Sequence, residues 1–387
     1  MKSPLQDQVD EWIAQHSFGL THPVYSSLDL RIAPYKSAVV DVNLFPCGFN
    51  NLCETMIESS SKSLLAYMEA HYPQAKKIAI FCEAHTRNNF YFLNLKALDT
   101  IITGAGYRCL FVHPTIEGEK EGLHFSLSHL AKADIVISNN DFSDGYSPLL
   151  ENLPIPVIPH RSLIWAKRRK SHHFSIIKDL AAELGDRLNL DPWLFSCEYE
   201  VEQQADLRDP HSLDSIKAKA TLLFDKLNQK YTQLGINAAP TLFIKDDAGT
   251  YGMGIMTIQS VEELDHLNRK TINKMHVGKQ HTINDLLIQE GVPSLVRHLE
   301  AVAEPVLYCV GNAFVGSFLR VNSLRDELAN LNAKGMEFFR LCEQDDKDKR
   351  QLPPECCGLD IMTDPSRIAA KLSLLAAAIE NTQALAA

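Results

Sequence analysis

The sequence predicts a mixed α/β chain, α+β overall, in which a parallel sheet covered by helices precedes an antiparallel sheet. Over the first 160 residues, short apolar strands alternate with helical segments, which is typical of a mainly parallel sheet. After Pro240, strand-like runs follow one another with short connections, which favours antiparallel pairing. We therefore expect three units, an N-terminal α/β substrate-binding domain over residues 1–160, a helical connector over 161–240 and a C-terminal domain over 241–387.

In the N-terminal unit, Ser37 to Val42 is a short apolar run and is expected to form the first strand of the parallel sheet. The other expected strands cover residues 77–83, 107–113, 134–138 and 154–159. The expected helices are 52–72 and 88–103, because Pro73 cannot continue the first and Gly104 and Gly106 end the second.

Polar side chains follow three of these strands: residues 41–43, 83–88 and 139–141. Ligands of parallel α/β sheets bind beyond the carboxyl ends of the strands, so three such clusters at one edge indicate a binding site. The alternative is turn and helix-cap chemistry, since Asn and Asp favour both positions.

The helices and strands of the connector and of the C-terminal unit are also predicted from hydrophobic periodicity. Helices are expected over 171–188 and 212–235, with an irregular acidic stretch at 198–209 between them. The strands expected after Pro240 are 241–245 and 255–258, followed by 285–289, 297–310 and 313–322 in an antiparallel sheet, with Gly311-Asn312 as a turn. Ser260 and Glu263 are spaced as a capping box for a short helix, residues 343–350 are expected as a surface loop, and 365–387 as a final helix.

Composition excludes several classes of protein. The chain has 387 residues, 45% of them hydrophobic and 22% charged, as in ordinary globular proteins. It contains no apolar run of transmembrane length, and its first residues lack the apolar segment of a signal peptide, so we expect a cytoplasmic protein without a membrane partner. The net charge of −10 argues against a nucleic-acid partner.

One basic run, Lys167-Arg168-Arg169-Lys170, stands out from this acidic background and is followed by two histidines. Runs of this kind usually form a solvated face. The alternative is a contact to an anion or a phosphate beside the start of a helix.

The nine cysteines show no metal-binding spacing and no CxxC motif, and two of them, Cys356 and Cys357, are adjacent. We expect reduced thiols packed as small hydrophobic side chains. A catalytic cysteine at Cys47 or Cys82 is the less favoured alternative.

The central motif is a glycine-rich loop between two expected strands, Gly249-Thr250-Tyr251-Gly252-Met253-Gly254, with Lys245 at the end of the incoming strand. Glycines bring backbone N–H groups close to a phosphate, and a lysine can place its ammonium over the same phosphates. The loop lacks the GKS/T of a Walker A motif and the glycine spacing of a Rossmann motif. A plain glycine-rich hairpin is the alternative.

Two later segments favour the phosphate-binding interpretation. Gln289-Glu290 ends a strand and could serve the adenine edge and the ribose hydroxyls, and Val292 follows shortly after. Arg320 lies near the end of another strand, where it could neutralise a phosphoryl group, and Asn322 and Asn332 could hold Mg²⁺.

In this order the segments resemble the ATP-grasp fold, and the whole chain resembles the ATP-grasp glutamate–cysteine ligases of proteobacteria. The similarity covers most of the chain, and the run 41–52 is its most family-specific part. The segments that carry the resemblance are 23–25, 29–31, 41–52, 85–88, 138–141, 168–174, the glycine loop and 303–306. The resemblance implies a pre-ATP-grasp domain followed by an ATP-grasp fold.

The resemblance implies that ATP phosphorylates the γ-carboxylate of glutamate and that cysteine then displaces phosphate, giving γ-glutamylcysteine, ADP and phosphate, the first step of glutathione biosynthesis. Mg²⁺ or Mn²⁺ would accompany ATP. No protein nucleophile is needed, so positioning and charge neutralisation would carry the catalysis. The glycine loop would close as a lid that excludes water.

These implications assign roles to particular residues. The expected catalytic residues are Lys245 and Arg320. The expected ATP-binding residues are Lys178, Lys245, Gly249, Thr250, Tyr251, Gly252, Met253, Gly254, Gln289, Glu290 and Val292. The expected substrate-binding residues are Asn43, Asn50, Asn51, Arg87 and Asn88, with helix capping as the alternative for Asn50 and Asn51.

The metal ligands depart from the pattern of the superfamily. ATP-grasp enzymes commonly use Glu-x-Asn, whereas this sequence has Arg320-Val321-Asn322. A carboxylate must therefore come from elsewhere, and Glu304 is expected with Asn322 and Asn332. Other acidic candidates are Asp326, Glu327 and Asp360.

Two alternative functions remain at this stage. One is an ATP-grasp ligase for another amino-acid pair, similar to glutathione synthetase, and the other is an ATP-binding protein without catalysis. The sequence leaves the oligomeric state open, and a homo-oligomer is compatible with it.

Overall fold

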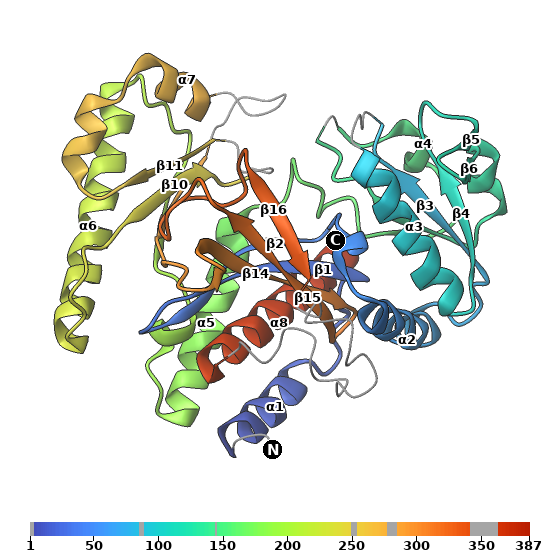
Figure 1. Cartoon of the computed structure of the whole chain (residues 1–387), viewed down its shortest axis with the longest axis horizontal. Helices are drawn as coiled ribbons and strands as arrows, with labels where there is room; N and C mark the ends of the chain where they lie inside the picture. Colours follow the sequence, from blue (N-terminus) through green and yellow to red (C-terminus); the bar gives the residue numbers. More distant parts are fainter. Residues whose placement is uncertain (1–3, 85–88, 144, 249–253, 277–284, 341–362) are drawn as a thin grey trace.

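The computed structural model describes residues 4–84, 89–143, 145–248, 254–276, 285–340 and 363–387, which form three sheets with helices around them. Figure 1 shows a central antiparallel sheet, with the N-terminal parallel sheet on one side and a smaller sheet under α6 and α7 on the other. None of the described helices is long and apolar enough to cross a membrane.

The N-terminal sheet confirms the predicted strand–helix alternation. Its strands β3 (Lys77–Cys82), β4 (Arg108–Val112), β7 (Ile135–Asn139) and β8 (Val157–Ile158) are parallel. Two short strands, β5 (Gly118–Lys120) and β6 (Leu123–Phe125), extend one edge, with β6 parallel to β4. The associated helices are α2 (Glu54–His71), α3 (Asn89–Gly104), α4 (Pro148–Glu151) and the 3₁₀ helices η1 (Phe49–Asn51) and η2 (Leu127–Lys132).

The assignment of residues 37–42 to this parallel sheet is wrong. They form β2 (Ser37–Asn43), which pairs antiparallel with β1 (Tyr25–Ile32), a strand that the sequence analysis missed. β1 in turn pairs with β14 (Ala301–Val310), and the sheet continues through β15 (Ala313–Asn322) to β16 (Met336–Arg340). An apolar run predicts a strand but not its partner, which explains the error.

The run 297–310 was predicted as one strand, but it is broken. Leu299 has a φ of 53°, a left-handed conformation that a strand cannot continue through. It separates β13 (Arg297–His298) from β14. The predicted turn at Gly311-Asn312 is confirmed, with Gly311 at a φ of 56°.

The small sheet consists of β9 (Tyr199–Glu202), β10 (Leu242–Asp246), β11 (Ile255–Ile258) and β12 (Leu286–Glu290). The predicted strand 285–289 therefore pairs with β10 and β9 and not with the strands that follow it. The acidic stretch 198–209, predicted as irregular, contains β9. The helix α6 (Pro210–Leu234) buries Ile216, Leu223 and Leu227 in the apolar core of this sheet.

Around the small sheet lie α7 (Arg269–His276) and the short helix predicted after Ser260, which is the 3₁₀ helix η4 (Val261–His266) with the expected capping box. The backbone N–H of Ser260 donates to the Glu263 carboxylate at 3.1 Å. This capping box provides hydrogen-bond acceptors for backbone N–H groups at the start of η4 that would otherwise have none.

The remaining helices cover the central sheet. The C-terminal helix α8 (Asp364–Ala386) packs against β2, β1 and α5 (Lys170–Leu188), and α1 (Pro4–His16) packs on α8 (Figure 1). A 3₁₀ helix, η3 (Pro192–Phe195), follows α5. The Ala/Leu-rich sequence of α8 suits this place because its alanines allow close packing, and Leu372, Leu375 and Ala376 are buried in the core.

Strands β1 and β2, predicted to belong to the N-terminal unit by their position in the sequence, thus share a sheet with β14, β15 and β16. The predicted boundaries near residues 160 and 240 stay predictions. What matters for the site is that all three sheets approach one another.

Candidate active site

A cavity with a volume of about 1000 Å³ is lined by residues from distant parts of the chain. One group of lining residues comes from β1, β2 and the loop that follows β2: Asp29, Asp41, Asn43, Cys47, Asn50 and Asn51. A second group comes from the N-terminal sheet and the start of α5: Glu83, Asn94, Asp141, Arg168 and Lys170. The rest includes Asp247 and Ala248 at the base of the glycine loop, Arg320, Asn332 and residues 336–339.

The three polar strand ends meet in this cavity. Asp41 and Asn43 come from β2, Glu83 follows β3 and Asp141 follows β7. The prediction that they converge is confirmed, although β2 belongs to the central sheet rather than to the parallel one. The cavity therefore lies between the central sheet and the N-terminal sheet, and the turn after β10 of the small sheet also contributes to its wall.

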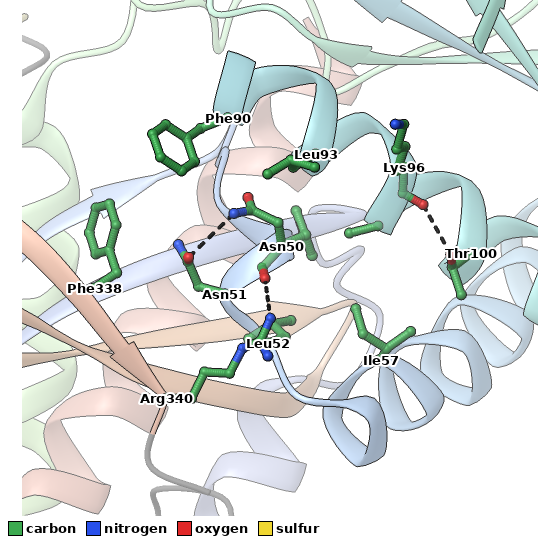
Figure 2. Close-up of a pocket in the computed structure, with 12 residues that line it drawn as sticks. Asn50, Asn51, Leu52, Ile57, Phe90, Leu93, Lys96, Thr100, Phe338 and Arg340 are labelled. Carbon is green, nitrogen blue, oxygen red and sulfur yellow. Dashed lines mark hydrogen bonds between the residues drawn. The ribbon is translucent and has the colours of Figure 1, made fainter. Parts of the chain in front are cut away.

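Asn50 and Asn51 form η1 and line the cavity, and the N-cap of α2 is Cys53. The alternative that this asparagine pair caps α2 is therefore wrong. Asn50 Nδ2 donates to Asn51 Oδ1 at 3.3 Å, so the two amides lie side by side (Figure 2). Both predicted substrate-binding asparagines thus reach the cavity.

Buried amides hold the loop that carries Asn50 and Asn51. Asn94 Oδ1 accepts hydrogen bonds from the backbone N–H groups of Gly48 at 2.9 Å and Phe49 at 3.0 Å. Asn94 Nδ2 donates to Asn139 Oδ1 at 3.0 Å, and Asn139 Nδ2 donates to the carbonyl of Pro46 at 3.0 Å. Because buried polar groups that are fully hydrogen-bonded fix a conformation, these amides position the loop against the parallel sheet.

The basic run is not simply a solvated face. Lys167 is exposed, but Arg168 and Lys170 line the cavity and are partly buried. Arg168 donates to both carboxylate oxygens of Glu380, at 3.1 and 2.9 Å, and to the carbonyl of Val42 at 2.7 Å. Lys170 forms an ion pair with Asp41. The interpretation as an anion contact beside a helix start fits these two residues.

Asp247 connects the base of the glycine loop to the N-terminus of α5. Its carboxylate accepts hydrogen bonds from the backbone N–H of Ser171 at 2.7 Å and the Ser171 hydroxyl at 2.6 Å. The N-cap residue of α5, Arg169, makes no side-chain cap. Asp247 therefore caps this helix from the turn after β10, where a negative charge also stabilises the helix dipole.

Lys245 is buried on β10, and its ammonium donates to the carbonyl of Val40 at 3.0 Å. Burial, together with the neighbouring charge of Lys170, lowers the pKa of Lys245 to about 8, although Asp41 opposes this shift. Burial alone would raise the pKa of Asp41, but Lys170 and Lys245 outweigh it and hold that pKa below its ordinary value. The two lysines and Asp41 therefore form one compact charged group.

Gln289 and Lys245 lie on the same face of the small sheet. Lys245 is opposite Leu287 in the register, and Leu287 and Gln289 are two residues apart on β12. The side-chain amide nitrogen of Gln289 is buried and has no hydrogen-bond partner within the described ranges. Because such atoms are uncommon in folded proteins, Gln289 is suited to donate to a ligand.

Glu290 is engaged with other residues of the chain. Both of its carboxylate oxygens accept hydrogen bonds from the Lys36 ammonium at 2.8 Å, and one also accepts from the backbone N–H of Glu198 at 3.0 Å. Lys36 also lies 4.0 Å from the centroid of the Trp193 ring. Val292 is buried in a small apolar cluster near this pair.

Arg320 lies between two carboxylates. It donates to Asp29 and to Glu304, both at 2.7 Å, and Glu304 also contacts the Arg31 guanidinium at 2.5 Å. Of the predicted metal ligands, Glu304 is thus neutralised by two arginines. Asn322 accepts from the backbone N–H of Leu324 at 3.1 Å and is fully buried, whereas Asn332 lines the cavity.

Other predicted site residues lie away from the cavity or outside the described residues. Lys178 is exposed on α5 and is not among the residues that line the cavity. Arg87, Asn88 and residues 249–253 of the glycine loop lie outside the described residues. Gly254 is described, and its carbonyl accepts from the backbone N–H of Asp246 at 3.2 Å.

A family model for glutamate–cysteine ligase matches the chain over two segments, residues 3–125 and 110–381. The chain belongs to the glutamate–cysteine ligase family. Among solved structures, a provisionally assigned gamma-glutamylcysteine synthetase from Methylobacillus flagellatus KT has a TM-score of 0.82 and 31% identity, covering 97% of this chain and 93% of that one. No curated protein sequence matches the chain.

The family membership establishes this chain as a glutamate–cysteine ligase, and it confirms the family that the sequence resembles. The protein is therefore an enzyme of the ligase class. The finer prediction that it has an ATP-grasp fold and comes from a proteobacterium stays a prediction.

The two candidate nucleophiles, Cys47 and Cys82, lie in surroundings that do not activate a thiol. Cys47 is exposed in the cavity wall, where desolvation by the surrounding walls and the carboxylates of Glu83 and Asp141 raise the pKa of its thiol well above the ordinary value. Burial also raises the pKa of Cys82, which is fully buried. Since the thiolate is the reactive form, neither thiol is activated.

Several residues of the site were missed from the sequence. They are Asn94 on α3, Asp247 in the turn after β10, Lys36 in the connection between β1 and β2, and Glu380 on α8. Asp29 and Arg31 on β1 were missed as well. Only Asp29 and Arg31 left a signal, because charged residues alternate there with Leu28, Leu30 and Ile32 in a run that reads as a strand.

Proposed function

We propose that this ligase is an ATP-grasp enzyme that joins the γ-carboxylate of L-glutamate to the amine of L-cysteine through γ-glutamyl phosphate. A carboxylate oxygen attacks the γ-phosphorus of ATP and ADP leaves. The cysteine amine then attacks the acyl carbon, phosphate leaves with its bridging oxygen, and the amine loses a proton. The observation that carries the proposal is the single cavity that joins the base of the glycine loop to three cationic side chains and several amides.

Two residues of the small sheet support the nucleotide part of the proposal, although neither is among the residues that line the cavity, which Asp247 and Ala248 reach from the turn after β10. Lys245 and Gln289 share the face described above, with a buried ammonium and a buried amide nitrogen that has no partner in the described part of the chain. An ammonium suits phosphate oxygens, and an amide N–H suits an adenine nitrogen or a ribose hydroxyl.

The chemical end of the cavity contains three cations, each held by a carboxylate. Arg168 is held by Glu380, Lys170 by Asp41 and Arg320 by Asp29 and Glu304. Charges fixed before the reaction stabilise developing negative charge without reorganisation. They would offset the charge of the transferred phosphoryl group and orient the carboxylates of glutamate.

The cavity also contains residues that could supply oxygen ligands to Mg²⁺ bound with ATP. In the described residues, no three His, Cys, Asp or Glu side chains gather into a metal cage. Mg²⁺ usually needs only one or two protein oxygens beside the phosphates and waters, and Asp29 and Asn332 offer such oxygens in the cavity. When bound, Mg²⁺ would neutralise phosphate charge.

Phosphate release from ATP, measured across amino-acid pairs, tests the proposal. We expect release with glutamate plus cysteine, and none above background with γ-glutamylcysteine plus glycine. The reverse result would indicate a glutathione-synthetase-like ligase. ATP binding without release for any pair would indicate a binding protein and would contradict the proposal.

A further inference from the structure

A second cavity, of about 540 Å³, adjoins the first. The two cavities share Asn50, Asn51, Phe90 and Phe338 as lining residues. Figure 2 shows Asn50 and Asn51 at the centre of this region, with Phe90, Leu93 and Phe338 around them. The predicted substrate-binding asparagines thus face two compartments, and the reaction joins two amino acids.

The second cavity has an apolar part and a polar part, and the polar part contains Asn50, Asn51 and Thr100 together with two positive charges. Its apolar lining residues are Phe49, Leu52, Ile57, Phe90, Leu93, Ala97 and Phe338. The charged residues that line it are Lys96 and Arg340, and no acidic residue is among its described lining residues. This combination favours a small ligand that has one anionic group and an apolar or weakly polar side chain.

Hydrogen bonding fixes the head group of Arg340 at this wall. Its Nη2 donates to the carbonyl of Asn50 at 2.8 Å, as Figure 2 shows. A guanidinium carries five N–H donors in a rigid fork, which suits a carboxylate. Arg340 is therefore held at this wall by a hydrogen bond, and its guanidinium is suited to bind the carboxylate of a ligand.

The sheet register relates Arg340 to the reaction centre. In the pairing of β15 with β16, Arg320 is opposite Phe338 and Phe318 is opposite Arg340. Arg340 lies two residues from Phe338, so both residues face the same side of the sheet and are separated by about 7 Å along the strand. Arg320 and Arg340 consequently point to the same side of the central sheet, one in each cavity.

We propose that the second cavity is the subsite of the acceptor amino acid, in which Arg340 binds the α-carboxylate of cysteine and the apolar wall faces its side chain. This inference rests on the proposed function. A carboxylate at Arg340 leaves the acceptor amine toward Asn51 and the first cavity, where the acyl phosphate forms. The cavity is larger than cysteine, so charge and not size selects the acceptor.

Comparing cysteine with cysteamine, which lacks the carboxylate, tests this subsite. In Arg340→Gln, kcat/KM for cysteine should fall about 30-fold, the effect of losing one charge-assisted pair, while kcat/KM for cysteamine stays within about twofold. The selectivity of the wild type for cysteine should therefore largely disappear. Arg297→Gln is the matched control, because it removes the same charge from an arginine that pairs with Glu327 and lines neither cavity.

If cysteamine turns over too slowly to measure, the KM values for cysteine, glutamate and ATP test the subsite instead. Arg340→Gln should raise KM for cysteine and leave KM for glutamate and ATP unchanged. An equal loss with both acceptors, or a rise in KM for glutamate instead, would overturn the subsite assignment. If the wild type does not ligate glutamate and cysteine at all, the proposed function fails instead, so the two failures are distinguishable.

Discussion

Lys245 is a buried ammonium whose pKa lies at about 8, low enough to titrate near physiological pH. Because burial and Lys170 lower this pKa, the positive charge is present below about pH 8 and is lost above it. We therefore predict that the Kd for a non-hydrolysable ATP analogue rises about tenfold per pH unit above pH 8. Calorimetric titration between pH 6.5 and 9.5 would measure it.

Lys245→Ala should bind the analogue weakly with little dependence on pH in this range, should lose most turnover and should keep the fold. Lys230→Ala is a suitable control, because Lys230 lies on α6 and pairs with Asp191 rather than with the group formed by Lys245, Lys170 and Asp41. Near-normal turnover in Lys245→Ala would contradict the assigned role.

Glu380 connects the C-terminal helix to the cavity through Arg168. Burial alone would raise the pKa of Glu380, but Arg168 and His173 outweigh it and lower this pKa to about 2. The unfolded chain therefore binds more protons between pH 4.5 and 2, so the stabilisation by Glu380 is complete above this window and is lost as the pH falls through it. Removing one partner of a buried ion pair costs about 3 kcal/mol.

We predict that Glu380→Gln lowers the free energy of unfolding by about that amount at pH 7, and that its difference from the wild type shrinks toward pH 2. Urea denaturation at several pH values would show this. Asp10→Asn is the control. It breaks the more exposed ion pair between Asp10 and Lys371, which lies on α8 as Glu380 does, and should lower the free energy of unfolding by less than about 1 kcal/mol. Equal costs for both variants would contradict the account of Glu380.

At the scale of elements, Asp247 joins the base of the glycine loop to the start of α5. Asp247→Ala should destabilise the protein by about 1–2 kcal/mol through the lost cap, and should also lower kcat/KM for ATP because the base of the loop is no longer fixed. Asp209→Ala is the matched control, since Asp209 caps α6 and lines neither cavity. Steady-state kinetics and thermal unfolding of both variants would separate the two effects, and an equal kcat/KM in both would contradict a role of Asp247 in the loop.

Most elements could be predicted from the sequence, but their partners could not. The periodicity of 77–83 and 212–235 indicates a strand and a helix directly, and α6 also has Pro210 at its start. β2 and β12 were each placed in the wrong sheet, because two-residue periodicity fixes which face is buried and not which strand is adjacent. β9 has only four residues, too few for periodicity to separate it from a loop.

The same limit applies to the site. Asn50, Asn51 and Arg320, which line the cavity, were named from motifs that are continuous in sequence, and the role of Lys245 stays a prediction. The residues that hold the cations could not be predicted: Glu380 lies 212 positions from Arg168, and Asp29 lies 291 positions from Arg320. Such contacts exist only after the chain has folded.

At the scale of the molecule, the cavity lies where the central sheet, the small sheet and the N-terminal sheet approach one another, with α5 and α8 behind the central sheet (Figure 1). Its lining residues run from Ser27 to Phe339, so the proposed chemistry depends on the whole fold. Glutamate, ATP and cysteine would each be bound from a different direction, which suits a reaction in two steps that must exclude water between them.

Transfer of oxygen from glutamate to phosphate tests the central claim most directly. Glutamate labelled with ¹⁸O in the γ-carboxylate is incubated with ATP, Mg²⁺, cysteine and the ligase, and the released phosphate is analysed by mass spectrometry. The account predicts one ¹⁸O atom in each phosphate formed together with γ-glutamylcysteine, because the acyl phosphate retains a carboxylate oxygen. Unlabelled phosphate alongside the same product would contradict it.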